Sequence, residues 1–111
     1  KEFQFDKLRL VDRYVWDLHC NWKIAMEANM EVYHVKSIHP ETVDPSLDYR
    51  GNVNTLYDRG HSRMVAPGRE GRNRAAYVRQ NAHLPQIDTV GEIGRTCTQS
   101  YHVEPNWVSP L

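Results

Sequence analysis

The hydrophobic and polar positions of the chain form two patterns in its first third. Over residues 3–16, aromatic and β-branched side chains stand among charged neighbours. This composition suits a pleated, half-buried surface and predicts one or two β-strands. After residue 21 the period changes, because Trp22, Met26 and Met30 recur in steps of four. That spacing places them on one face of an α-helix that a sheet could cover.

The limits of this helix are set by residues with known capping and breaking effects. Asn21 precedes a run of helix formers from Trp22 to Val35, and its short side chain suits the N-cap. Pro40 has no backbone N–H and disfavours helical geometry at the residue before it. We therefore expect a helix that starts at Asn21 and has ended by His39.

The second half of the chain is richer in turn signals. Residues 52–57 and 61–66 flank the sequence Asp58-Arg59-Gly60, which favours a β-hairpin with Gly60 at a positive φ. The other predicted elements are a loop or short helical turn at 41–50, a surface loop at 67–74, a short helix at 75–83, and a strand near 97–103.

Composition limits the class of protein. With 111 residues the chain can form one domain, and 14 basic and 14 acidic side chains cancel. A nucleic-acid binder would need a basic stripe, which is missing. No apolar run is long enough for a membrane span and the first residues lack the core of a signal peptide, so we expect a soluble cytoplasmic protein. Cys20 and Cys97 are expected to be free thiols.

The candidate chemistry lies in a pair of histidines. Two imidazoles and one carboxylate on one face of a metal ion leave positions open for oxygen and a substrate. His34 and His39 are five residues apart, about 500° of turn on a regular helix, so they would point roughly 140° apart. A shared metal requires the helix to unwind between them. Ile38 and Pro40 lower the helical tendency there.

Glu31 is the expected partner of the first histidine. It stands three residues before His34, on the same side of a helix, and can accept the second imidazole N–H. Spacing alone leaves open that His34 and His39 are unrelated residues on a solvated helix end. A zinc protease is disfavoured, because no glutamate follows the first histidine as in HExxH.

The string NWKIAMEANMEVYHVKSIHP, residues 21–40, resembles the iron-binding segment of the large subunit of Rieske non-heme iron oxygenases, the aromatic-ring-hydroxylating family. The matching positions are Asn21-Trp22-Lys23, Glu27, Glu31, Tyr33-His34 and His39-Pro40. The resemblance implies that His34 and His39 bind Fe(II), and that Glu31 links the iron to the Rieske cluster of a neighbouring subunit. The family usually has aspartate at the position of Glu31, and Ala28 stands where asparagine is common.

The resemblance also implies an α+β fold of the helix-grip type, in which an antiparallel sheet packs on a long helix. Residues 1–111 would be part of the iron-binding catalytic domain. The chain has no C-x-H followed by C-x-x-H, so the Rieske domain is expected to precede it. The third ligand, a carboxylate, is expected beyond Leu111. Asp88, Glu92 and Glu104 are interpreted as surface acids.

For the intact protein the resemblance implies O2-dependent hydroxylation or dihydroxylation of an aromatic or other apolar substrate. Electrons from NAD(P)H would arrive through a ferredoxin or reductase and a [2Fe-2S] cluster, in a trimer-based oligomer. Val35 and Ile38 are predicted to line the substrate pocket, although core packing explains them equally well. The alternative is a non-catalytic helix-grip module that binds an apolar ligand without a metal.

Overall fold

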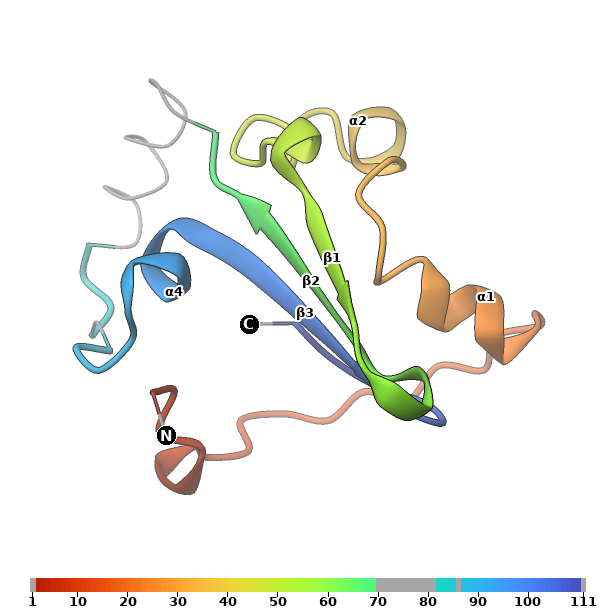
Figure 1. Cartoon of the computed structure of the whole chain (residues 1–111). Coiled ribbons are helices and arrows are strands. Elements are labelled where there is room, and N and C mark those ends of the chain that lie inside the picture. Colours follow the sequence, from red (N-terminus) through yellow and green to blue (C-terminus); the bar gives the residue numbers. More distant parts are fainter. Residues whose placement is uncertain (1, 70–81, 86, 111) are drawn as a thin grey trace.

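A four-stranded antiparallel sheet forms the centre of the computed structural model, which describes residues 2–69, 82–85 and 87–110 (Figure 1). Its strands neighbour one another in chain order, β1-β2-β3-β4. Three short α-helices accompany them within these residues, so the fold is α+β. The bounds are β1 Val53–Leu56, β2 Ser62–Pro67, β3 Cys97–Val103, β4 Trp107–Pro110, α1 Trp22–Glu27, α2 Val35–Ile38 and α4 Glu92–Thr96.

The β1–β2 hairpin is the one that the sequence predicts. Val53 pairs with Val65 and Leu56 with Ser62, and the turn between them is the 3-10 segment η3, Asp58–Gly60. Gly60 has φ 83°, the left-handed conformation that glycine adopts without steric cost. Both the hairpin and the conformation of Gly60 are therefore confirmed.

The helix after Asn21 starts as predicted and ends early. The Asn21 side chain accepts a hydrogen bond from the N–H of Lys23 at 3.0 Å, so it is the N-cap of α1. A continuous helix to Val35 was the wrong prediction, because α1 ends at Glu27 and helical geometry returns only in α2. The intervening turn carries Val32 into the core, where it is 3% exposed, and this packing overrides local helix propensity.

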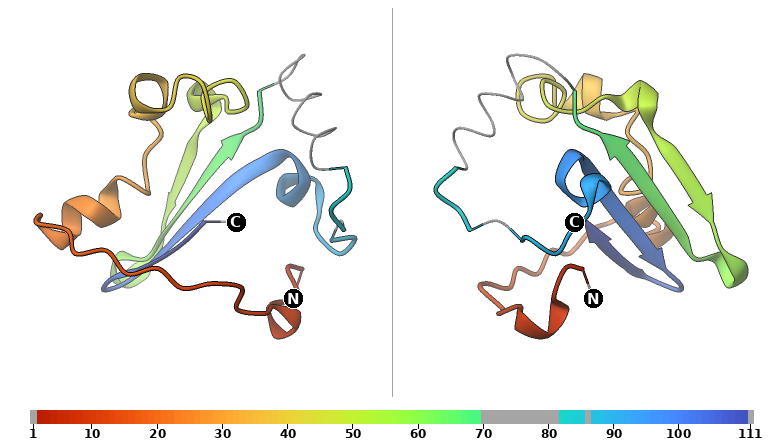
Figure 2. Two further views of the ribbon diagram at one scale, coloured as in Figure 1. Left: turned by 180° about the vertical axis from the view of Figure 1, so that it is seen from behind. Right: turned by 60° about the vertical axis from the view of Figure 1, so that its left-hand side comes forward.

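The predicted strands at residues 3–16 are absent from the described part of the chain. A single 3-10 turn, η1 Phe5–Lys7, is followed by an extended stretch that joins no sheet (Figure 2). Leu10 and Val11 are 86% and 96% exposed there. A β-propensity becomes a strand only when a neighbouring strand supplies hydrogen bonds and covers the side chains, and no described segment does so.

The remaining predictions have mixed outcomes. The strand near 97–103 is confirmed as β3, which pairs with β2, while β4 and α4 were not predicted. The 41–50 segment forms turns that lead into the 3-10 segment η2, Tyr49–Gly51. The loop predicted at 67–74 and the helix predicted at 75–83 lie largely outside the described residues.

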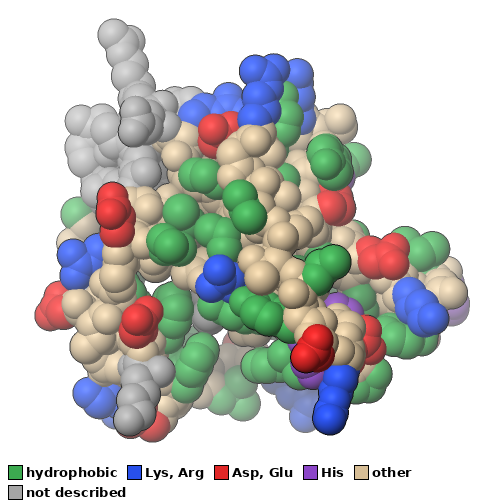
Figure 3. Space-filling model, viewed as in Figure 1, with side chains coloured by type: hydrophobic (Ala, Val, Ile, Leu, Met, Phe, Trp, Pro, Cys, Tyr) green, Lys and Arg blue, Asp and Glu red, His purple; other side chains and the backbone are tan. Residues whose placement is uncertain are grey.

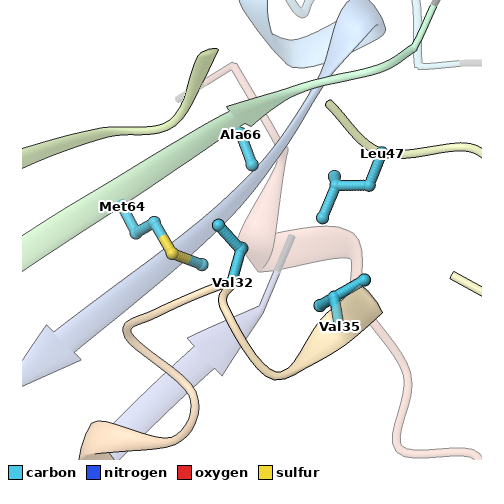
Figure 4. Packing of buried hydrophobic residues seen from close by; sticks show 5 residues of the cluster. All are labelled: Val32, Val35, Leu47, Met64 and Ala66. Carbon is cyan, nitrogen blue, oxygen red and sulfur yellow. The ribbon is translucent and has the colours of Figure 1, made fainter. Parts of the chain in front are cut away.

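The core lies where α2 and the preceding turn meet the sheet. Five buried side chains cluster there, with Met30 and Tyr49 packed against them (Figure 4). Many apolar side chains remain outside this small core, and hydrophobic atoms are spread across the face in Figure 3. Trp22 and Tyr33, for example, are 48% and 79% exposed. The cluster consists of Val32, Val35, Leu47, Met64 and Ala66.

The described residues also show the state of the two cysteines and the length of the helices. Cys20 and Cys97 are both free thiols, as predicted. None of the helices in the described ranges has the length and apolar character that crossing a membrane would require.

The core makes a prediction about stability. Leu47 is 6% exposed, so Leu47→Ala removes buried methyl groups and should lower the free energy of unfolding by about 2–4 kcal/mol. Leu56→Ala is the matched control, because Leu56 is 82% exposed and the same change should cost less than about 0.5 kcal/mol. Urea titration followed by circular dichroism measures both; equal losses would contradict the position of the core.

Candidate metal centre

The two histidines of the predicted pair lie at the two ends of α2. His34 is the residue before the helix and still has helical backbone angles, φ −67° and ψ −23°. His39 follows the helix with φ −122° and ψ 45°, which is no longer helical. A single turn of helix therefore separates the two side chains.

This departure from helical geometry brings the rings together. The N–H of His39 still donates to the carbonyl of Val35 at 2.8 Å, but the φ of −122° at His39 departs from the helical value and changes the direction of its side chain. The ring centroids of His34 and His39 are 5.5 Å apart, and the ring planes meet at 73°. On a continuous helix the same residues would diverge.

The spacing of the two rings fits a shared metal ion. A metal–imidazole bond of about 2.1 Å places the metal roughly 3.2 Å from the ring centroid. Two imidazoles on one ion therefore have centroids at most about 6.4 Å apart. The observed 5.5 Å lies inside this limit. Imidazole nitrogens are also suitable donors for iron, so the residues fit a metal of this class.

Glu31 is in direct contact with the first histidine, as the spacing predicted. Its Oε1 forms a hydrogen bond with Nδ1 of His34, and its Oε2 accepts hydrogen bonds from the backbone N–H groups of Tyr33 and His34. Burial by itself raises the pKa of the Glu31 carboxyl. The hydrogen bonds from the His34 ring and from the two N–H groups outweigh burial and lower that pKa.

The ionised carboxylate fixes which ring nitrogen of His34 faces a metal. A carboxylate without a proton can only accept hydrogen bonds, so Nδ1 of His34 carries the hydrogen. In the neutral imidazole Nε2 then keeps its lone pair, which is the form that binds a metal. The second nitrogen is held by the carboxylate, an arrangement that orients metal-binding histidines in general.

A third ligand does not accompany the pair in the ranges 2–69, 82–85 and 87–110. Across these residues, no three side chains of His, Cys, Asp or Glu come together in a way that would hold a metal ion. Asp88, Glu92 and Glu104 therefore do not complete the site. The two residues predicted to line the substrate pocket differ in exposure. Val35 is buried in the core, and Ile38 is 67% exposed.

His102 is a residue whose position the sequence did not reveal. It had no readable partner in the sequence, yet the β2–β3 register places it opposite Ser62. Its side chain is largely buried and lines a cavity beside α1. A signal was present in the alternation of β3, which puts His102 on the same face as Ser100.

Comparison with known proteins gives one match. The chain fits the family described as "Ring hydroxylating alpha subunit (catalytic domain)" over residues 5–109. No curated protein and no solved structure matches it. The match covers nearly the whole chain and includes the segment with Glu31, His34 and His39.

The contact between Glu31 and His34 predicts a fixed tautomer. Long-range ¹H–¹⁵N spectra of the metal-free protein, recorded where imidazoles are neutral, should show the hydrogen of His34 on Nδ1. Glu31→Ala should remove this preference, while Glu41→Ala, which changes an exposed glutamate, should preserve it. A His34 hydrogen on Nε2 in the unmodified protein would contradict the assignment.

Proposed function

Because this chain belongs to the ring hydroxylating alpha subunit (catalytic domain) family, we propose that it provides two of the ligands of a mononuclear Fe(II) centre in an oxygenase. The observation that carries the proposal is the geometry of Glu31, His34 and His39. Two imidazoles lie 5.5 Å apart, and one of them is held by a carboxylate. Two solvent-exposed histidines that share no ligand would not require a carboxylate to orient one of the rings.

In the proposed site Nε2 of His34 and a ring nitrogen of His39 bind the metal. Bound Fe(II) would supply the activation of O2 for hydroxylation or dihydroxylation of an aromatic or other apolar substrate. The chain's own contribution is to hold the two rings at the ends of α2. We propose that the third ligand is a carboxylate outside the described residues, in keeping with the family pattern.

We further propose that Glu31 connects the iron site to the electron source. In the intact enzyme, electrons from NAD(P)H would pass through a ferredoxin or reductase to a [2Fe-2S] Rieske cluster of a neighbouring subunit. A trimer-based oligomer would place that cluster close to Glu31. The side chain of Glu31 is 30% exposed, so a group from another subunit can reach it.

The finer features of the fold follow the same proposal. We propose that the four-stranded sheet is part of a helix-grip domain and that Ile38 and Val35 contribute to the apolar lining near the iron. The sequence-based expectation of a cytoplasmic protein remains a prediction. A metal-free module that binds an apolar ligand is the alternative, and iron binding separates the two.

Iron binding is the direct test. Under anaerobic conditions the protein should bind one Fe(II) in calorimetric titration, and His34→Ala or His39→Ala should weaken binding at least about tenfold. His19→Ala is the matched control, because His19 is an exposed histidine away from the pair. If Fe(II) does not bind, or binds equally to all three variants, His34 and His39 do not form an iron site in this chain.

The role of Glu31 can be tested in the assembled enzyme with its cluster-bearing partner and reductase. Glu31→Gln should retain iron but slow the oxidation of the reduced cluster about tenfold or more, since it removes the charged acceptor. Stopped-flow absorbance of the cluster follows this step. Glu41→Gln should react like the unmodified enzyme, and an equally fast Glu31→Gln would exclude Glu31 from the electron route.

A further inference from the structure

A cavity of about 510 Å³ lies between the N-terminal turn and the last two strands of the sheet. The turn, which contains η1, lies near the C-terminal end of β4 in both views of Figure 2. The turn forms one wall of the cavity, and β3 and β4 form its floor. None of Glu31, His34 and His39 lines it, so the cavity differs in composition from the candidate metal centre.

The floor of the cavity is one face of the β3–β4 pair. Tyr101 and Val103 are two residues apart on β3, so their side chains point to the same face. Trp107 is paired with Val103 across the two strands, which brings its indole onto this face as well. The ring of Tyr101 is held, because its hydroxyl donates to Oε1 of Gln99 at 3.1 Å. The register of the two strands therefore places two aromatic rings on the floor.

The opposite wall is held in position by long-range hydrogen bonds. The hydroxyl of Thr89 donates to the backbone carbonyl of Glu2, and Nε2 of Gln4 donates to the same hydroxyl oxygen at 3.0 Å. The ring centroids of Phe3 and Phe5 are 6.1 Å apart, and both rings line the cavity. Two further aromatic rings thus face the floor from a segment that is fixed at residue 89.

Four aromatic rings and one carboxylate give this cavity a preference for positive charge. The face of an aromatic ring is negative and attracts a cation within about 6 Å of its centroid. Among the described residues that line the cavity, Glu2 is the only one with a charged side chain. An anion would meet this carboxylate without a compensating positive group in the lining. The electrostatics therefore favour a cation.

The scarcity of hydrogen-bond acceptors in the lining indicates which type of cation fits. Phe5 and Trp107 are 56% and 58% exposed, so their rings are accessible to a ligand from solvent. An ammonium group with N–H donors is strongly hydrated and needs acceptors to replace its water. A quaternary ammonium group has no N–H and carries its charge behind apolar methyl groups, which is the chemistry that clusters of aromatic rings recognise.

We propose that this cavity binds a small quaternary ammonium ion. Its methylated nitrogen contacts the rings of Phe5, Tyr101 and Trp107, and the carboxylate of Glu2 supplies the opposite charge. Binding involves no covalent step and requires no metal. The inference does not depend on the proposed oxygenase function, because it uses other residues and would hold for a metal-free protein.

The test is calorimetric titration of the whole chain, free of metal, with choline as the probe. Its neutral counterpart 3,3-dimethylbutan-1-ol has the same shape, with a carbon atom in place of the charged nitrogen. Choline should bind at least about fivefold more tightly, because the rings and the carboxylate attract only the cation. A cavity that is merely apolar would prefer the alcohol. Equal affinities, a preference for the alcohol, or no binding of choline would overturn the proposal.

Variants connect the binding to the rings and to the carboxylate. Trp107→Leu should weaken choline binding about fivefold and leave the alcohol almost unaffected, and Trp107→Phe should restore part of the loss. Trp16→Leu is the matched control, since Trp16 is 76% exposed and lies outside the cavity. Glu2→Gln should weaken choline binding about threefold, whereas Glu41→Gln, also an exposed glutamate, should have no effect. If Trp107→Leu unfolds the chain, Glu2→Gln decides. Unchanged choline affinity in a folded Trp107→Leu variant, or in Glu2→Gln, refutes the site.

Discussion

The hydrogen bonds accepted by the Glu31 carboxylate are the interaction on which the candidate metal centre depends. One oxygen holds the ring of His34, and the other accepts from the N–H groups of Tyr33 and His34. These N–H groups would otherwise need carbonyl partners one turn earlier in a continuous helix. The same carboxylate therefore stabilises the turn between α1 and α2 and orients the first histidine.

The hydrophobic core stabilises the turn between α1 and α2. Val32, inside the turn, and Val35, inside α2, are both buried against Met64 and Ala66 of β2 (Figure 4). Because α2 is only four residues long, its position cannot come from helix propensity. Packing of these two valines on the sheet fixes the helix, and the helix fixes the distance between His34 and His39. The site thus depends on a few apolar contacts that lie next to it in sequence.

Sequence reasoning succeeded where the structure follows from local chemistry. Asn21 as a cap, Gly60 as a positive-φ turn residue and Pro40 as a helix terminator act within a few residues, so the start of α1, the hairpin and the end of α2 were predictable. The contact of Glu31 with His34 was also predicted from their separation of three residues, although it forms across a turn and not along a helix.

The predictions that were wrong or missing depend on contacts between residues far apart in the sequence. The break after Glu27 results from burial of Val32 on a strand about thirty residues away, and residues 8–20 stay unpaired because no described strand meets them. His102 reaches its largely buried position beside α1 only through the register of β2 with β3. Local sequence carries no information on such long-range pairings.

Glu31, where the resemblance leads us to expect aspartate, has a defined set of contacts in the structure. The carboxylate of Glu31 serves three donors at once, two of them on its own backbone within three residues. A carboxylate has about four lone-pair positions, so one is left for a further donor. Because the Glu31 side chain is 30% exposed, that position is accessible to a further donor without the loss of these contacts.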